Sequence, residues 1–165
     1  MVPILASSCG GSAKPASTGA SRSVAGPGFA FSVPDGWVVK HGRGTVVVRR
    51  SDGTLVSATA YRLARPYSPA LFIKAAKELD VVAARLAQAS NGSVTESATT
   101  TVDGQKIRAY RFTAHPAGKP VSDDRVGFVL EGKREFQLLC SAPAGSGDPD
   151  GACALLFGTF AAAVQ

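Results

Sequence analysis

One segment of the chain, residues 68–92, has the periodicity of a helix, whereas strand-like runs lie before and after it. Its apolar residues recur at a spacing of three and four, which places them on one helical face: Leu71, Ala75, Leu79, Val82, Ala83 and Leu86. Ser68 and Pro69 are typical of a helix start, and Asn91 with Gly92 is typical of a left-handed cap. The pattern therefore predicts one long helix that covers a sheet with its apolar face.

The segments around this helix have the alternating or β-branched composition of strands. They are separated by turn residues and comprise residues 29–33, 45–50, 55–63, 94–97, 106–113, 125–130 and 135–140. A tight turn over residues 131–134 predicts that the last two runs form a hairpin, and residues 152–164 have the apolar content of a short closing helix. The predicted fold class is α+β, with a mostly antiparallel sheet covered by one long helix and a C-terminal helix.

Two positions are predicted to lie in the core. Trp37, the single tryptophan, follows a turn directly, and Leu79 lies in the middle of the helical stripe. The strand over residues 106–113 has apolar side chains on both faces, with Ala109 on one and Tyr110 on the other. Alternation alone therefore leaves open which face of this strand is buried.

The first residues predict where in the cell the protein is located. Residues 5–9 read LASSC, which resembles the lipobox of bacterial lipoprotein precursors, and Cys9 is the residue that would carry the lipid. Because the apolar run is short and lacks a basic residue, residues 1–9 are interpreted as a truncated signal. Residues 10–27 are predicted to be a flexible tether and residues 28–165 a single domain. The competing interpretation of Cys9 is an exposed thiol in a disordered tail.

The other two cysteines are predicted to form a disulfide. Cys140 ends an apolar stretch, and Cys153 opens the C-terminal segment across a loop rich in Gly, Pro and Asp. A disulfide fits the oxidising side of a membrane and leaves Cys9 for the lipid. The alternative is two separate reduced cysteines in the core.

Residues 29–37 read FAFSVPDGW and resemble the opening strand and turn of the Mog1/PsbP-like fold. The order of the later elements is also similar to that of actinobacterial envelope lipoproteins of this type. The resemblance covers roughly residues 29–160 and implies a compact binding or adaptor module, since relatives serve as an accessory subunit of photosystem II and as a partner of a small GTPase. No functional residue is carried over from those relatives.

Motifs for catalysis are weak. The two histidines, His41 and His115, lie beside turn residues, and the chain has no nucleophile elbow. Residues 42–44 lack the third glycine of a dinucleotide fingerprint, and the carboxylates near residues 123–124 and 148–150 lack the ligand spacing of a calcium loop. The sequence therefore predicts no catalytic residue, no metal site and no cofactor.

The chain is basic, with a formal net charge of +6. Arginines on or beside the predicted strands are candidates for one surface that binds anions: Arg49, Arg50, Arg62, Arg108 and Arg111. Nucleic acid is not an expected partner, because few aromatic residues accompany these arginines and the address is extracytoplasmic. Anionic lipids or envelope polymers fit better, and the alternative is a solvated strand face without specificity.

These observations favour a non-catalytic protein that is lipid-anchored on the extracytoplasmic face of the cell membrane in an actinobacterial-type bacterium. There it is expected to be a binding or accessory module for an envelope protein or an anionic polymer. One alternative is a carrier of an apolar small molecule, which needs a cavity lined by residues such as Phe72, Leu79 and Phe112. Another is an undetected hydrolase, which needs His41 or His115 beside a serine and a carboxylate.

Overall fold

Nine strands and two α-helices lie within residues 19–163, the part of the chain that this computed structural model describes. The strands before the long helix are β1 (Ser21–Gly26), β2 (Phe29–Pro34), β3 (Val38–Gly42), β4 (Thr45–Arg49) and β5 (Leu55–Tyr67). A 3-10 helix over Pro69–Leu71 leads into α1 (Phe72–Ala89). The remaining elements are β6 (Ser93–Val102), β7 (Gln105–Ala114), β8 (Ser122–Pro143), a 3-10 helix (Pro149–Gly151), α2 (Ala152–Thr159) and β9 (Ala161–Ala162).

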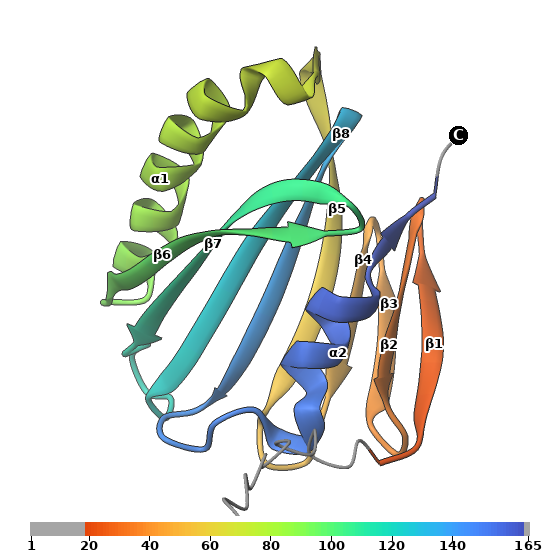
Figure 1. Ribbon diagram of the computed structural model, residues 1–165. Coiled ribbons are helices and arrows are strands. Elements are labelled where there is room, and N and C mark those ends of the chain that lie inside the picture. Colours follow the sequence, from red (N-terminus) through yellow and green to blue (C-terminus); the bar gives the residue numbers. More distant parts are fainter. Residues whose placement is uncertain (1–18, 164–165) are drawn as a thin grey trace, which may run out of the picture.

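The strands form two antiparallel sheets. The larger sheet has the order β3-β4-β5-β8-β7-β6, and the smaller has the order β1-β2-β9. Helix α1 covers one face of the larger sheet, while α2 and the smaller sheet lie against the other face (Figure 1). The α+β class with one long helix and a C-terminal helix is therefore confirmed.

Strand β8 folds back on itself near Gly132 and so occupies two neighbouring places in the larger sheet (Figure 1). Its first part pairs with β7 and its second part pairs with β5. The backbone N–H of Ala144 donates to the carbonyl oxygen of Val121 at 3.0 Å, which joins the two ends. Gly132 has a φ of 54°, a left-handed conformation that glycine adopts at little cost. The hairpin predicted around residues 131–134 is confirmed.

The larger sheet is buried on both faces, which answers the question that alternation left open. On β7, Ile107 and Ala109 belong to the larger core, between the sheet and α2. Tyr110 and Phe112, which point the other way, belong to the smaller core beneath α1. Because helices cover both faces, β7 needs apolar side chains on each of them.

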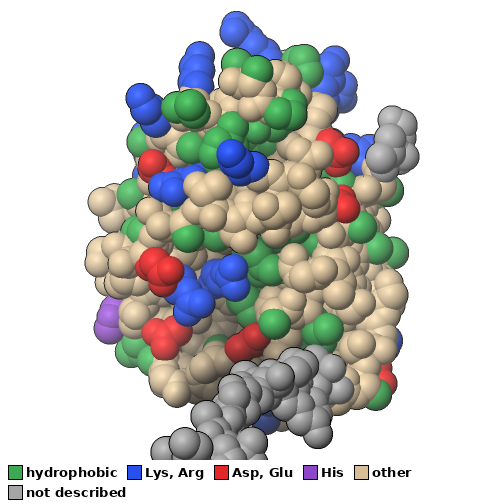
Figure 2. Space-filling model, viewed as in Figure 1, with side chains coloured by type: hydrophobic (Ala, Val, Ile, Leu, Met, Phe, Trp, Pro, Cys, Tyr) green, Lys and Arg blue, Asp and Glu red, His purple; other side chains and the backbone are tan. Residues whose placement is uncertain are grey.

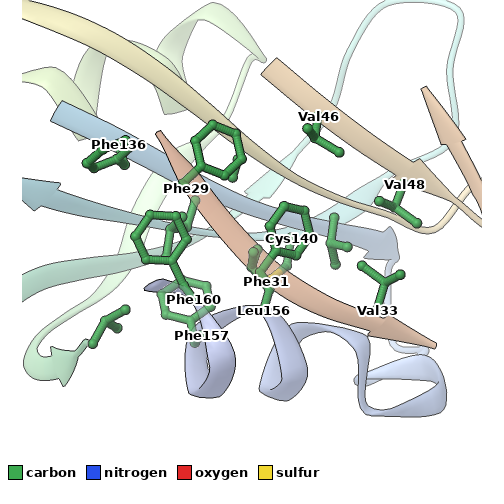
Figure 3. Close-up of a cluster of buried hydrophobic side chains, with 14 of the residues drawn as sticks. Phe29, Phe31, Val33, Val46, Val48, Phe136, Cys140, Leu156, Phe157 and Phe160 are labelled. Atoms are coloured by element: carbon green, nitrogen blue, oxygen red, sulfur yellow. The ribbon is translucent and has the colours of Figure 1, made fainter. Parts of the chain in front are cut away.

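Aromatic side chains fill the larger core (Figure 3). The ring of Phe136 on β8 lies 5.4 Å from that of Phe160 and 5.9 Å from that of Phe29, measured between centroids. Phe31 and Leu156 are also almost completely buried there. Trp37 belongs to this core, as predicted, and Leu79 belongs to the smaller one. Burial of such side chains is the main favourable contribution to folding.

Helix α1 is linked to the sheet through the carboxylate of Asp80, which accepts hydrogen bonds from β7. The hydroxyl of Tyr110 donates to Oδ1 of Asp80 at 2.7 Å, and Nη2 of Arg108 donates to the same oxygen at 2.9 Å. Burial and the hydrogen bond to Asp80 raise the pKa of Tyr110, so its hydroxyl stays protonated. The helix also ends as predicted, with Asn91 at a φ of 53° and the N–H of Gly92 bonded to the carbonyl of Ala87.

Three elements differ from the expectations. Residues 21–26 form β1, although residues 10–27 were predicted to be a tether, because backbone pairing with β2 and the contact of Val24 with the core order a segment of small residues. Strand β3 was not predicted. The closing helix ends at Thr159 rather than Val164, because Phe160 turns to an extended conformation and its ring enters the core, which lets β9 pair with β2.

Candidate functional site

Two neighbouring hollows lie on the α2 side of the larger sheet, with volumes of about 400 Å³ and about 240 Å³. Arg111 on β7 and Arg125 on β8 line both of them. Figure 2 shows basic and acidic side chains gathered beside α2 on this face. These two arginines are therefore the feature that the hollows share.

The two arginines stand directly opposite each other on paired strands. The register of β7 and β8 matches Arg111 with Arg125, and the register of β6 and β7 matches Glu96 with Arg111. Nε of Arg111 lies 3.4 Å from Oε2 of Glu96, and both side chains are largely exposed. Like charges directly opposite each other destabilise a sheet. This cost makes the pair a candidate for a role other than stability.

Arg125 is the more buried of the two. Its guanidinium lies 4.0 Å from the centre of the Phe157 ring, and Gly127 leaves room for that ring, because a Cβ there would lie 2.6 Å from it. The ion pairs found among residues 19–163 do not include Arg125. Burial first, and then the positive charge of Arg111, lower the pKa of Arg125. An arginine nevertheless keeps its charge in proteins, so an anion placed here would be stabilised.

Two acidic residues in the lining of the larger hollow, Asp123 and Asp148, are already engaged within the fold. Asp123 accepts hydrogen bonds from the hydroxyl of Thr113 and from a backbone N–H. Asp148 accepts two from the backbone N–H groups of Cys153 and Ala154, at the start of α2. These carboxylates lower the net charge of the larger hollow, but their oxygens serve the fold.

Asp124 also belongs to the lining, but it is next to Arg125 on β8 and is paired with Phe112. By strand alternation its side chain therefore points to the face beneath α1, where Phe112 and Val126 are buried. The two guanidinium groups are thus what the larger hollow offers to a negative group.

The disulfide predicted between Cys140 and Cys153 is confirmed. It links β8 to α2, with a Cα–Cα distance of 5.6 Å, and both cysteines line the larger hollow. The bond therefore holds the helix that carries Phe157 against the sheet that carries Arg125.

The structure does not gather the five predicted arginines into one surface. By strand alternation Arg49 and Arg108 face the α1 side of the larger sheet, whereas Arg62 and Arg111 face the α2 side. Arg50 lies just beyond the end of β4. The prediction of a single surface was wrong, because successive residues of a strand point to opposite faces.

Besides Arg111, which pairs with Glu96, two of these arginines make internal contacts. Arg50 lies 3.6 Å from Asp52 and 3.2 Å from Asp150, and Arg108 binds Asp80 as described above. Of the predicted set only Arg111 lines the hollows. Arg125 was not among the candidates. The sequence placed it on a predicted strand beside polar neighbours, but it did not reveal the register that sets Arg125 opposite Arg111.

The carrier and hydrolase alternatives depend on other residues, whose positions are as follows. Neither hollow has Phe72 or Leu79 in its lining, although Phe112 lines the larger one. His41 and His115 are exposed. Within residues 19–163 no three His, Cys, Asp or Glu side chains are grouped so that they could hold a metal ion.

Cys9 and the rest of residues 1–18 lie outside the described residues. Of the two helices described, neither combines the length and the apolar composition needed to cross a membrane. These observations leave the predicted lipid attachment at Cys9 as an expectation.

Comparison with known proteins identifies the fold. No family model and no curated protein matches the sequence. The solution structure of cyanobacterial PsbP (CyanoP) from Synechocystis sp. PCC 6803 is similar, with a TM-score of 0.59 and 14% identity over 92% of this chain and 98% of that one. A crystal structure from Bacteroides thetaiotaomicron VPI-5482 is also similar, with a TM-score of 0.62 and 15% identity. This match covers 90% of this chain but only 50% of that longer one. The chain therefore has the PsbP/Mog1-like fold.

Proposed function

We propose that this chain is a non-catalytic binding module of the cell envelope in an actinobacterial-type bacterium, anchored to the membrane through a lipid on Cys9. In this proposal an anionic group of an envelope partner, a protein or a polymer, docks between Arg111 and Arg125. The PsbP/Mog1-like fold supports the proposal, because it is compatible with an accessory module.

The observation that carries the proposal is the facing pair of arginines at the hollows. The half-buried Arg125 has no carboxylate partner among the described residues, and its neighbour is a second cation. The more distant carboxylates of Asp148 and Glu96 attract Arg125, but burial and the charge of Arg111 have the larger effect and lower its pKa. A partly desolvated charge in a hollow is a candidate for a functional site. An anion between the two guanidinium groups would offset both the burial and the repulsion.

The chemistry of the partner follows from the lining. Two guanidinium groups match the oxygens of a carboxylate or a phosphate, which they bind with charge-assisted hydrogen bonds. Negative groups of this kind are common to acidic polysaccharides and to acidic peptide segments.

The first test uses inorganic phosphate as the probe. Phosphate added to the folded protein is expected to shift the side-chain Nε–Hε NMR signals of Arg111 and Arg125, whereas chloride at equal ionic strength leaves them unchanged. Arg125→Gln is expected to weaken this binding by about tenfold or more, as loss of a hydrogen bond to a charged group does. Arg49→Gln is the matched control, because Arg49 lies on the other face of the sheet. Equal weakening by both variants, or no shift at either signal, contradicts the site.

The anchor has a separate test. Intact-mass analysis of the membrane-extracted protein is expected to show a lipid adduct on Cys9. A wash in 1 M salt, which reduces the Debye length to about 3 Å, is expected to release the Cys9→Ser protein but not the wild type. A Cys9→Ser protein that stays with membranes through this wash would contradict the lipid anchor.

A further inference from the structure

The end of the molecule where α1 begins carries exposed apolar side chains. Tyr61 on β5, Leu71 in the 3-10 helix and Ile73 in the first turn of α1 are 49%, 46% and 75% exposed. The end of β5, the start of α1 and the turn of β8 lie together at the top of Figure 1. Figure 2 shows Lys and Arg side chains around hydrophobic ones at this end.

This end is also basic. Between Tyr61 and Lys77 the sequence has four basic residues and no acidic one: Arg62, Arg65, Lys74 and Lys77. The fold adds Lys106, whose Nζ lies 5.5 Å from the centre of the Phe72 ring, and Lys133, which follows a residue paired with Tyr67. We call residues 61–77 together with Lys106 and Lys133 the basic tip.

Folding does not explain the composition of the basic tip. The first turn of α1 has Lys74 and no acidic residue, although the positive end of the helix dipole disfavours a cation there. Ile73 points most of its side chain into solvent. Acidic residues near the tip are Glu78, which follows it on α1, and Glu131 and Glu135, which flank the β8 turn and are half-buried. The basic residues of the tip still outnumber them.

We propose that the basic tip is a peripheral contact with the surface of an anionic lipid bilayer. Lysines and arginines near such a surface are attracted to its headgroups. Leu71 and Ile73 would enter the boundary between headgroups and acyl chains, and Tyr61 has the amphipathic ring that favours this depth. The contact involves residues other than Arg111 and Arg125, and it does not require a lipid on Cys9.

The apolar side chains favour a bilayer over a soluble polyanion. A polyanion would match the lysines and arginines but would leave Ile73 and Leu71 in water. A bilayer accepts both kinds of side chain, because burial of apolar area adds to the electrostatic attraction. The contribution of Ile73 therefore distinguishes the two partners.

The test measures co-sedimentation of the full chain with vesicles at physiological ionic strength. All proteins carry Cys9→Ser, so that no lipid anchor contributes, and the vesicles contain equal amounts of phosphatidylglycerol and phosphatidylcholine. The parent protein is expected to bind these vesicles and not pure phosphatidylcholine. Removal of two charges by Lys74→Gln with Lys77→Gln is expected to lower the partition coefficient by about 25-fold, at about fivefold for each basic residue.

Two matched controls accompany these variants. Lys40→Gln with Lys119→Gln removes the same charge from exposed positions outside the tip, and Val38→Ser removes an apolar side chain that is exposed on β3. Ile73→Ser is expected to lower partitioning by about tenfold, because an apolar side chain no longer leaves water, whereas Val38→Ser has little effect. Because Ile73, Lys74 and Lys77 are exposed, unchanged circular dichroism is expected for every variant.

Three results would overturn the proposal. The first is that the parent protein fails to sediment with anionic vesicles. The second is that the control substitutions at Lys40 and Lys119 reduce binding as much as those at Lys74 and Lys77. The third is that Ile73→Ser binds as well as the parent, which would assign the tip to a soluble polyanion. The proposed anion site is unaffected by any of these results, because its test uses phosphate and Arg125.

Discussion

Replacement of Trp37 by alanine is expected to lower the free energy of unfolding by about 3–5 kcal/mol, the usual loss for a large buried aromatic side chain. Trp37 is 5% exposed and lies in the larger core. Its indole Nε1–H also donates to Oδ2 of Asp150 at 3.1 Å, and the same oxygen lies 3.2 Å from Nη1 of Arg50. The side chain therefore joins the turn after β2 to the segment that precedes α2.

Denaturant unfolding followed by circular dichroism measures this effect, since the variant has no tryptophan to report by fluorescence. Trp37→Phe is the control: it keeps an aromatic ring in the core but loses the hydrogen bond to Asp150, and a typical hydrogen bond contributes about 0.5–1.5 kcal/mol. Its free energy of unfolding should therefore lie between those of the wild type and the alanine variant. An alanine variant that unfolds at the same denaturant concentration as the wild type but loses partner binding would make Trp37 a binding residue instead.

Loss of the disulfide is the second large effect. Conversion of both Cys140 and Cys153 to alanine is expected to lower the free energy of unfolding by about 2–5 kcal/mol, as removal of a native disulfide from a small secreted domain does. The bond closes a loop between cysteines 13 positions apart and joins β8 to α2. The fold then has to order this loop and dock α2 without the covalent link.

Non-reducing peptide mapping and unfolding with and without reductant test this prediction together. The wild type under reducing conditions should approach the stability of the double variant, and the double variant itself should not respond to reductant. Free thiols at both positions after expression in an oxidising compartment would contradict the pairing. A double variant as stable as the oxidised wild type would show that the bond does not stabilise the domain.

The sequence was most informative where the local pattern and the tertiary contacts agree. Helix α1 has a clear apolar stripe and a left-handed end, so its position was predicted closely. Strand β1 has small and polar residues, and it is ordered mainly by pairing with β2, which no local pattern reveals. The short β9 depends in the same way on a partner strand, and the side chain of Phe160 ends the preceding helix by entering the core.

The candidate site depends on register, which is why the sequence did not reveal it. Arg111 and Arg125 are 14 positions apart, and only the pairing of β7 with β8 places them opposite each other. Burial of Arg125 follows from Phe157 on α2, a third segment. The arginines that the sequence did select are divided between two faces, because composition shows how many charges a strand carries but not what each one meets.

Photo-crosslinking in cells shows whether a partner docks at the arginine pair. A photo-reactive amino acid at Ala98, which is exposed and lines the smaller hollow, is compared with one at Ala89, which is exposed at the end of α1. A discrete adduct is expected from position 98, and it should disappear when Arg111→Gln and Arg125→Gln are added. No such adduct is expected from position 89. An adduct at position 98 that survives the loss of both arginines, or one formed equally from position 89, would contradict docking at this pair.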